Sequence, residues 1–349
     1  MKSKLIQKGC GVNGNTEVLT KNGWKFYYEL KIRELIPTLN FKKQLIEFLP
    51  IEKISVENCN EEVYNIKNYY LDCILSKEQK VIIKRAVEKQ KGSYENRKRW
   101  TEWLDWELIS IDDLLKTPNK RLVKYKLSGI LGNSGISISK ARAGLLGWIL
   151  TDGCIPKRIR NGNPEVSISQ SYTANKKKCD KIENLLKESE LEYSSKLSNI
   201  KINKFNRKKY RMMTFRIFNK SNKWVFDWIN SDRTPKWKLL QLKKEELEEL
   251  YENIMLGDGS KGIELSTQNK RRIDFFRVLC CLIGKRTKLS FGNLTLSEGK
   301  KYRTYITQKD NCGLLKNHFK KIHYNGIIWK PKTKNGTFIA RHNETIFII

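Results

Sequence analysis

The sequence lacks several features that mark large classes of protein. No stretch approaches the roughly 20 apolar residues that a membrane-spanning helix needs, and the Met-Lys-Ser-Lys start lacks the apolar core of a signal peptide. The three His residues, at positions 318, 323 and 342, form no zinc-binding pattern, and the eight Cys residues include no pair at metal-binding spacing. We therefore expect no membrane partner and no targeting signal, and free thiols in a reducing intracellular compartment, the cytoplasm or nucleoid.

Positive charge is what the sequence has in excess. Lys and Arg number 69 against 37 Asp and Glu, which gives a net charge of +32 over 349 residues. The content of 39% hydrophobic residues and nine Trp predicts a folded protein, and the length favours two or three domains over one core. A folded protein of this charge indicates a polyanionic partner.

One short motif occurs twice. Leu145–Gly153 reads Leu-Leu-Gly-Trp-Ile-Leu-Thr-Asp-Gly, and Tyr251–Gly259 repeats it in degraded form. Each copy predicts an apolar helix that ends in Asp-Gly. Two such helices packed side by side would bring Asp152 and Asp258 to one end of their shared seam, where a carboxylate pair can hold a divalent metal.

Small residues in the motif predict a close approach of the two helices. Gly147 and Thr151, spaced four residues apart, form a narrow ridge, and Gly257 does the same in the second copy. Asn253 stands where the first copy has Gly147, and this larger residue predicts a looser seam.

The elements predicted after each motif copy follow the same order. Ser139 is the expected N-cap of the first motif helix. We therefore expect a weak internal repeat of about a hundred residues. The first half has a strand at 166–170, a helix at 179–189 and strands at 196–203 and 210–218; the second has a strand at 262–267, a helix at 272–283 and strands at 288–296 and 301–307.

The flanking segments are predicted to be mostly β. Asn22-Gly23 between two apolar stretches is a strong hairpin signal, and residues 327–349 are predicted as strands with a turn at 334–337. The polar, basic residues 88–100 predict a solvated loop, and Leu131–Gly135 a linker.

At the two motifs the chain resembles the LAGLIDADG homing endonucleases in their single-chain form. The resemblance covers about Ser139–His323 and includes Asp232–Trp237, which is similar to the Lys-x-Ile-Pro segment that precedes the second motif in that family. It implies an α+β fold with a pseudo-symmetric αββαββα domain, and a monomer whose antiparallel strands lie in the major groove of double-stranded DNA. It also implies cleavage of both strands at a long recognition site, leaving short 3′ overhangs.

The chemistry of that reaction explains the acids. Phosphodiester hydrolysis must activate a water and stabilise the leaving 3′ oxygen, and Mg²⁺ (or Mn²⁺) held by carboxylates does both. We place Asp152, Asp258, Thr151 and Gly257 at the metal site.

Basic residues are expected at the catalytic centre and along the DNA. The family resemblance implies a basic residue near each acid, a role that we assign to Arg233 or Lys236 in the first half and to Lys309 or Lys316 in the second. Strands in a major groove carry polar side chains on one face. The expected DNA-binding residues are Lys157, Arg158, Arg160, Ser167, Ser169, Gln170, Lys196, Lys201, Arg211, Arg216, Lys288 and Arg303.

The flanking segments resemble a second family, the inteins, in their Hint domain. Cys10–Thr20 looks like the opening block, in which a Cys begins protein splicing, and Lys332–Arg341 resembles the late strands. This implies a mobile genetic element with a mostly β Hint-like domain. It would be built from residues 1–130 and 324–349 and interrupted by an endonuclease domain at 131–323, with repeats at about 139–238 and 245–323.

The residues that splicing needs depart from the intein pattern. The family's Thr-x-x-His is replaced by Ser76–Gln79, and Gln cannot exchange a proton near neutral pH as His can. The chain stops at Ile349 rather than at Asn, and the His342-Asn343 pair lies where a hairpin is expected. We expect splicing to be lost and Cys10 to be a small buried residue rather than a nucleophile.

The sequence thus predicts a free-standing, intein-derived homing endonuclease, an endodeoxyribonuclease. Two alternatives stay open. A LAGLIDADG protein without catalysis that binds RNA, like a maturase, would not need the two acids that are retained here. An active intein with trimmed ends is the other alternative, and Gln79 speaks against it.

Overall fold

The computed structural model describes residues 10–91, 96–116, 123–132, 135–155, 165–203, 207–218, 222–293 and 300–349. Internal contacts divide the chain into two compact units of mixed α and β structure. The terminal unit contains Met1–Leu131, Gly284–Lys288 and Thr307–Ile349, and the central unit contains Gly132–Ile283 and Leu289–Ile306. Residues 284–288 and 307–323, which the sequence analysis places in the endonuclease domain, therefore group with the two chain ends.

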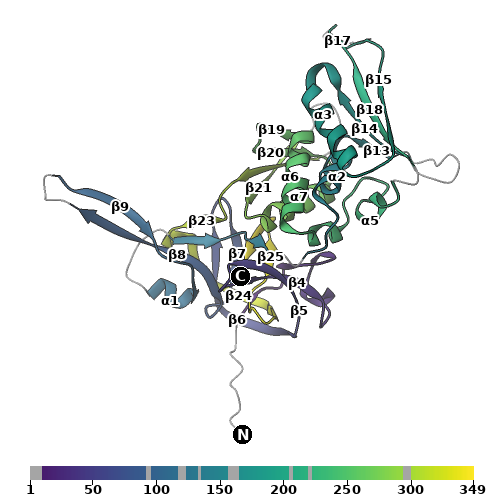
Figure 1. Ribbon diagram of the computed structural model, residues 1–349. Helices are drawn as coiled ribbons and strands as arrows, with labels where there is room; N and C mark the ends of the chain where they lie inside the picture. Colours follow the sequence, from purple (N-terminus) through teal and green to yellow (C-terminus); the bar gives the residue numbers. More distant parts are fainter. Residues whose placement is uncertain are drawn as a thin grey trace. The chain divides into compact units, whose positions relative to one another are not determined.

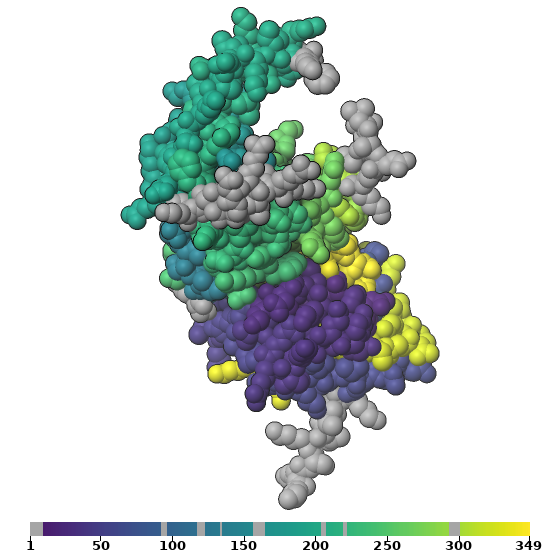
Figure 2. All heavy atoms as spheres, turned by 90° about the vertical axis from the view of Figure 1, so that its right-hand side faces the viewer, coloured from purple at the N-terminus to yellow at the C-terminus, as the bar shows by residue number. Residues whose placement is uncertain are grey.

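The terminal unit is built mostly from strands, and both ends of the chain contribute to it. The barrel order is β1-β24-β6-β7, and β24 pairs with β6 along its whole length, from Phe319 opposite Ile66 to Lys332 opposite Lys53. Figure 2 shows the N-terminal and C-terminal segments side by side, in purple and yellow. The strands of this barrel are β1 (Val12–Asn13), β6 (Lys53–Lys67), β7 (Asp72–Leu75) and β24 (Phe319–Lys332).

The other sheets of the terminal unit surround the same core. One has the order β26-β25-β2-β3 and a second contains β10-β8-β11-β23. The Asn22-Gly23 hairpin is confirmed, with Gly23 at φ 109. The remaining elements are β2 (Glu17–Thr20), β3 (Gly23–Lys25), β4 (Leu35–Asn40), β5 (Leu45–Pro50), β8 (Lys80–Lys91), β9 (Lys98–Trp103), β10 (Glu107–Ser110), α1 (Ile111–Lys116), β11 (Val123–Lys126), β12 (Ile130–Leu131), β23 (Asn311–Leu314), β25 (Ile339–His342) and β26 (Thr345–Ile348).

The prediction of a solvated loop at 88–100 is wrong. β8 and β9 form a long antiparallel hairpin, paired from Ala86 opposite Trp103 to Lys91 opposite Lys98, and Figure 1 shows it extending away from the rest of the terminal unit. The outer part of this hairpin is exposed on both faces. A strand without a buried face has no apolar alternation, and for this reason the sequence pattern missed it.

The central unit consists of two halves with the same order of elements. Its two four-stranded sheets have the orders β13-β14-β18-β15 and β19-β20-β22-β21, so that each strand of the first has its counterpart in the second. The first half contains α2 (Lys140–Asp152), β13 (Gly153–Cys154), β14 (Val166–Ser171), α3 (Tyr172–Glu188), β15 (Tyr193–Leu197), β16 (Lys201–Ile202), β17 (Lys209–Tyr210), β18 (Met212–Ile217) and α5 (Val225–Trp228). The second contains α6 (Lys244–Asp258), β19 (Gly259–Ser260), β20 (Glu264–Thr267) and α7 (Lys270–Leu282), with β21 (Arg286–Asn293) and β22 (Lys300–Thr307) crossing into the terminal unit.

The helix α2 forms where the sequence predicts it. The hydroxyl of Ser139 accepts a hydrogen bond from the backbone N–H of Arg142, which confirms the predicted N-cap. Every residue from Ala143 to Leu150 is buried, so the helix is enclosed by protein and packs along α6. None of the helices in the described part of the chain is long and apolar enough to cross a membrane.

The seam between α2 and α6 is closely packed. A Cβ atom added to Gly257 would lie 2.6 Å from the Cβ of Thr151, and one added to Gly147 would lie 2.8 Å from the Cβ of Asn253. Asn253 does not loosen the seam as its size predicted, because it is fully buried against Gly147 and Gly144. The glycines of α2 leave the room that Asn253 occupies.

We expect Gly257→Ala to destabilise the central unit by about 1–3 kcal/mol, the usual cost of overpacking, because the new methyl group would collide with Thr151. Chemical denaturation followed by circular dichroism measures this change. Gly292→Ala in β21 is the matched control, since a Cβ there meets nothing within 4 Å. Equal stability of the two variants would contradict the close seam.

Candidate functional site

The two repeated Asp-Gly motifs have the same local structure. α2 ends at Asp152 and α6 ends at Asp258, and each is followed by a glycine in an extended conformation. Gly153 has φ −73 and ψ 156, and Gly259 has φ −72 and ψ 146. The chain therefore leaves both helices in the same direction relative to the helix axis and enters a short strand, β13 or β19.

The seam brings the two carboxylates close enough to repel each other. The surrounding protein raises the pKa of Asp258, and the negative charge of Asp152 raises it further. Burial likewise raises the pKa of Asp152, while a hydrogen bond from Gln170 opposes this. Asp258 is an exposed residue, whereas Asp152 is half-buried. The pair is thus an electrostatically unfavourable arrangement that a cation would relieve.

Arg233 lies at this acidic centre, as the family resemblance implies. Its guanidinium donates to the backbone carbonyl oxygens of Gly153 and Thr151, and its positive charge lowers the pKa of both Asp152 and Asp258. The backbone of Arg233 has φ 60, a left-handed conformation that residues other than glycine seldom adopt.

Two further cations at the centre were missed by the sequence analysis. Arg272 in α7 donates from Nε to the carbonyl oxygen of Arg233 at 3.1 Å, and its charge lowers the pKa of Asp258. The charge of Lys178 in α3 lowers the pKa of both Asp152 and Asp258. Both residues lie on the helix that follows the first long strand of its half, and this shared position is the signal that could have found them.

The other basic residues assigned to catalysis have different surroundings. The ammonium of Lys236 donates to the carbonyl oxygen of Phe226, and this bond anchors the segment before α6. Lys309 and Lys316 belong to the terminal unit, whereas Asp258 belongs to the central unit. Arg272, Arg233 and Lys178 are residues of the central unit whose charges lower the pKa of Asp258.

Gln170 holds the carboxylate of Asp152. Its Nε2 donates to Oδ2 of Asp152 at 2.8 Å, and its own Oε1 accepts from Asn175 at 3.4 Å. It is buried on the inner face of β14 together with Val166 and Ile168. The sequence analysis places Gln170 among the residues that contact DNA; in the structure its side chain positions an acid instead.

A small cavity adjoins Asp258 within the central unit. Its volume is about 30 Å³, and its lining includes Thr151, Asp258 and Arg272. This volume suits a water molecule or a small ion rather than an organic ligand. No group of three or more His, Cys, Asp or Glu side chains that could hold a metal ion lies in the described ranges.

The sheet of the first half presents one polar face. Ser167 pairs with Arg216 and Ser169 with Thr214 across β14 and β18, and Lys196 lies opposite Thr214 on β15. The alternate residues, such as Ile168 and Phe215, are buried. The predicted alternation of a polar and an apolar face is therefore confirmed for β14.

The remaining candidates for DNA contact are distributed more widely. Arg211 donates to the carbonyl oxygen of Ser198, Arg303 pairs with Glu264 at 2.9 Å, and Lys201 is exposed on β16. Lys288 belongs to the terminal unit. Lys157, Arg158 and Arg160 lie outside the described residues.

In the terminal unit, Cys10 meets the segment that resembles the internal intein block. Its thiol is half-buried and donates to Oε1 of Gln79 at 3.3 Å, while the ammonium of Lys330 donates to the sulfur at 3.3 Å. The hydroxyl of Ser76 accepts from the backbone N–H of Gly11 at 2.9 Å. The residues on which the Hint resemblance depends are thus brought together, with Gln79 beside the thiol.

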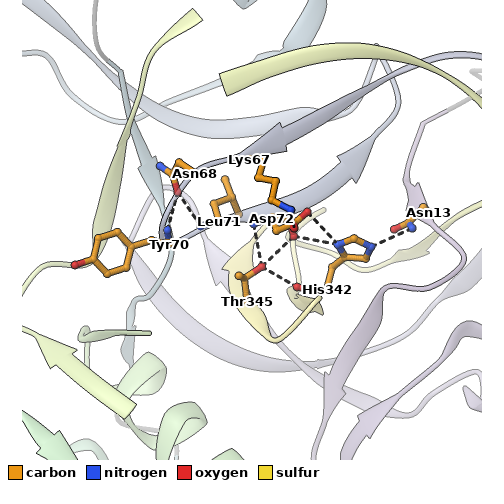
Figure 3. A network of polar contacts seen from close by, with 8 residues as sticks. All are labelled: Asn13, Lys67, Asn68, Tyr70, Leu71, Asp72, His342 and Thr345. Carbon is orange, nitrogen blue, oxygen red and sulfur yellow. Dashed lines mark hydrogen bonds and ion pairs between the residues drawn. The ribbon is translucent and has the colours of Figure 1, made fainter. Parts of the chain in front are cut away.

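His342 lies in a separate buried network of the terminal unit (Figure 3). Asn13 donates to Nε2 of the imidazole, because the other side-chain atom of Asn13, Oδ1, accepts from Thr16. Nδ1 then donates to the carbonyl oxygen of Asp72 at 3.1 Å. These contacts fit a neutral imidazole, and burial lowers the pKa of His342 accordingly. The Asn343-Glu344 turn that follows is the expected hairpin, between β25 and β26.

Comparison with known proteins adds little to this description. No protein-family model matches the chain, and no curated protein sequence matches it. Among solved structures it is similar to one described as "The homing endonuclease I-WcaI bound to its DNA recognition sequence", at 18% identity and a TM-score of 0.35, over 50% of this chain and 79% of that one. The function is therefore argued from the site itself.

We expect Asp258→Asn to raise the Tm in metal-free buffer at neutral pH. The folded protein raises the pKa of this carboxyl, so ionisation costs stability as pH rises above the unfolded value of about 3.9. Replacing the charge should add roughly 1–3 °C, a modest gain because water screens the partly exposed carboxylate. Scanning calorimetry between acidic and neutral pH should show the gain shrink toward low pH. Asp227→Asn, at an exposed position in α5, is the control, and a gain that grows on acidification would contradict the repulsion.

We expect His342→Gln to destabilise the terminal unit at neutral pH by about 1–2 kcal/mol, because the imidazole hydrogen bonds to Asn13 and Asp72 are lost. The folded state lowers the pKa of His342, so the wild-type protein loses stability as pH falls through about 6.5. Denaturation at several pH values should therefore show the two proteins converge in acid. His323→Gln, at an exposed position, is the control, and its free energy of unfolding should differ from that of the wild type by the same amount at every pH. A difference between His342→Gln and the wild type that widens in acid would contradict the prediction.

Proposed function

We propose that this chain is a site-specific endonuclease that cuts both strands of DNA in a metal-dependent reaction. The observation that carries the proposal is the pair Asp152 and Asp258, held at one end of the α2–α6 seam and repelling each other. A structural role alone gives no reason to gather two like charges where burial raises the pKa of both. A binding site for a divalent cation does give one.

The residues present fit Mg²⁺ or Mn²⁺. Carboxylate and backbone oxygens are the ligands that these hard cations prefer, and Mg²⁺ is commonly held by one or two carboxylates together with water and substrate phosphates. Asp152 and Asp258 would hold the metal, next to the backbone of Thr151 and Gly257. When bound, it supplies an activated water and charge neutralisation at the phosphate.

The other side chains of the centre have roles that follow from their contacts. Gln170 orients Asp152 through a hydrogen bond to Oδ2. Arg233 and Arg272 form a linked cationic pair, since Arg272 donates to the carbonyl oxygen of Arg233. Positive charge beside the acids stabilises the additional negative charge that develops on a phosphate and its leaving oxygen during cleavage.

The DNA would lie against the polar sheet faces of the central unit. The face that carries Ser167, Ser169, Lys196 and Arg216 presents hydroxyl and cationic groups in register across three strands. Such groups contact base edges and phosphates in a major groove. The repeated sheet order supports a pseudo-symmetric αββαββα domain of the LAGLIDADG type. For a domain of this type we propose cleavage that leaves short 3′ overhangs.

The terminal unit fits a Hint-like domain that no longer splices. Gln79 contacts Cys10 where the resemblance implies a proton-exchanging His. Asn343 lies inside a hairpin that continues to Ile348, so no splice junction follows it. We assign this unit a structural and DNA-contacting role.

The test is cleavage of a library of duplexes by the full chain. With Mg²⁺ we expect double-strand products, and with EDTA none. Asp152→Asn and Asp258→Asn should each reduce cleavage by roughly 10³-fold or more while DNA binding persists, because each removes charge from the reacting centre rather than from the DNA surface. Sequencing of the product ends measures the overhang.

Asp227→Asn is the control for the loss of one acid elsewhere in the central unit, and it should cleave as the wild type does. Absence of cleavage in Mg²⁺ would refute the nuclease. Cleavage that survives both EDTA and the two acid variants would refute the metal-dependent centre at Asp152 and Asp258. Tight binding of structured RNA with no cleavage of any duplex would favour the maturase-like alternative instead.

A further inference from the structure

The terminal unit contains a second concentration of positive charge, at a hollow of about 560 Å³. We call it the cation pocket and define it by Tyr69, Tyr70, Lys124, Arg286, Lys309 and His318. All six residues belong to the terminal unit. The pocket is therefore separate from the acids of the central unit, and neither the proposed cleavage nor the Hint resemblance uses it.

One wall of the pocket is a rigid turn. The Oδ1 of Asn68 accepts from the backbone N–H groups of Tyr70 and Leu71, both at 2.8 Å (Figure 3). The Nδ2 of Asn68 donates to the carbonyl oxygen of Gly313 in β23 at 2.9 Å, which fastens the turn to the sheet. The two tyrosines are thus presented from a fixed backbone.

The sheet supplies a second wall with cations on one face. Lys124 in β11 lies opposite Lys84 in β8 and opposite Gly313 in β23, while its neighbours Val123 and Tyr125 face the core. Partial burial lowers the pKa of Lys124, and the charges of Lys84 and Lys309 lower it further. Asp310, the nearby acid, is paired with Lys126 at 2.7 Å. The cations of the pocket therefore repel one another, and an anion would relieve this repulsion.

Aromatic rings hold these cations in place. The guanidinium of Arg286 lies 3.8 Å from the ring centroid of Tyr70, and the ammonium of Lys124 lies 3.9 Å from that of Trp103. Arg286 also donates to the hydroxyl of Thr307 at 2.8 Å. Cations fixed in this way lose little conformational entropy when they bind an anion. Because cations already cover the faces of the Tyr70 and Trp103 rings, no base can stack there, and the pocket is suited to a phosphate instead.

Positive charge also gathers at the outer end of the β8–β9 hairpin, whereas Arg85 and Lys89 are paired with Glu107 and Glu102. Trp103, whose ring contacts the ammonium of Lys124, is the last residue of β9. The exposed residues Lys98 and Arg99 lie at the beginning of that strand. The hairpin pairs Lys91 with Lys98, which doubles the charge at its outer part. A polyanion that enters the pocket can therefore follow the hairpin, whereas a single small anion would use the pocket alone.

We infer that the cation pocket binds a phosphate of the DNA backbone, so that the terminal unit anchors the duplex outside the cleavage centre. The inference rests on the proposed function for its partner, DNA. The volume of the hollow exceeds that of a bare phosphate and leaves room for the attached sugars. Backbone phosphates carry no sequence information, so the anchor would raise affinity for every sequence alike.

The test uses the full chain in EDTA and a fluorescent duplex of random sequence. We expect the triple variant Lys124→Gln, Arg286→Gln, Lys309→Gln to bind at least tenfold more weakly at low salt, with the salt dependence of log Kd reduced by about one. The control triple variant Lys21→Gln, Lys31→Gln, Lys334→Gln removes the same charge from exposed positions of the same unit and should change affinity far less. Equal losses of affinity in the two triple variants would overturn the pocket, because the net positive charge of the unit would then explain both losses.

Lys309→Glu is the second variant, because Lys309 is exposed and its replacement leaves the fold intact. We expect it to weaken binding as well, and unchanged affinity would count against the pocket. A mononucleotide added at the phosphate concentration of the duplex identifies the source of the phosphate. If it binds to the wild type but not to the triple variant, while the two proteins bind the duplex equally well, the pocket is a nucleotide site and the backbone anchor is refuted. If the triple variant loses affinity as expected but the wild type cleaves no duplex, only the nuclease is refuted. If the wild type cleaves DNA but the triple variant binds it as tightly as the control variant does, only the pocket is refuted.

Discussion

The close approach of α2 and α6 is the constraint on which the candidate site depends. Two helices bring their ends together only if small residues line their contact, and here Gly147 and Gly257 leave no space for a Cβ. The same contact accommodates Asn253, which is fully buried against α2, donates to Glu249 and keeps an Oδ1 with no partner among the described residues. A buried amide without a complete set of hydrogen bonds costs free energy. The unpaired Oδ1 of Asn253 therefore destabilises the seam, in addition to the repulsion between the two acids at its end.

The electrostatics of the centre follow from this packing. Burial raises the pKa of both acids, and the charge of Asp152 raises the pKa of Asp258 further. Arg233 and Lys178 lower the pKa of both acids, and Arg272 lowers that of Asp258. Burial and Arg233 also lower the pKa of Arg272. The side chains of the centre carry charges of both signs, as would the metal ion and the phosphodiester that we propose as its ligands.

The sequence predicted what periodicity and repetition encode and missed what depends on distant contacts. The two Asp-Gly helices, the N-cap at Ser139 and the alternation of β14 were all visible in local pattern. The role of Gln170 was not, because a polar residue in a strand gives no sign of which face it joins. Arg272 reaches the acids only because α7 packs near α6. The β8–β9 hairpin was hidden for a different reason, since its outer strands bury neither face.

The two ends of the chain meet within the terminal unit. β24 and β25, from the end of the chain, pair with β6 and β2 near its beginning, so the terminal unit closes only after the central unit has been synthesised. Its core cluster contains only its own residues, among them Val12, Trp329 and Phe347. The packing that holds the acids lies within the central unit, between Lys140 and Asp258. The contacts of Gln79 lie in the terminal unit and those of the α2–α6 seam in the central unit, so we expect replacement of Gln79 to leave the seam untouched. The barrel pairs strands from the beginning of the chain with β24 near its end, and the terminal unit therefore depends on contacts between the two chain ends.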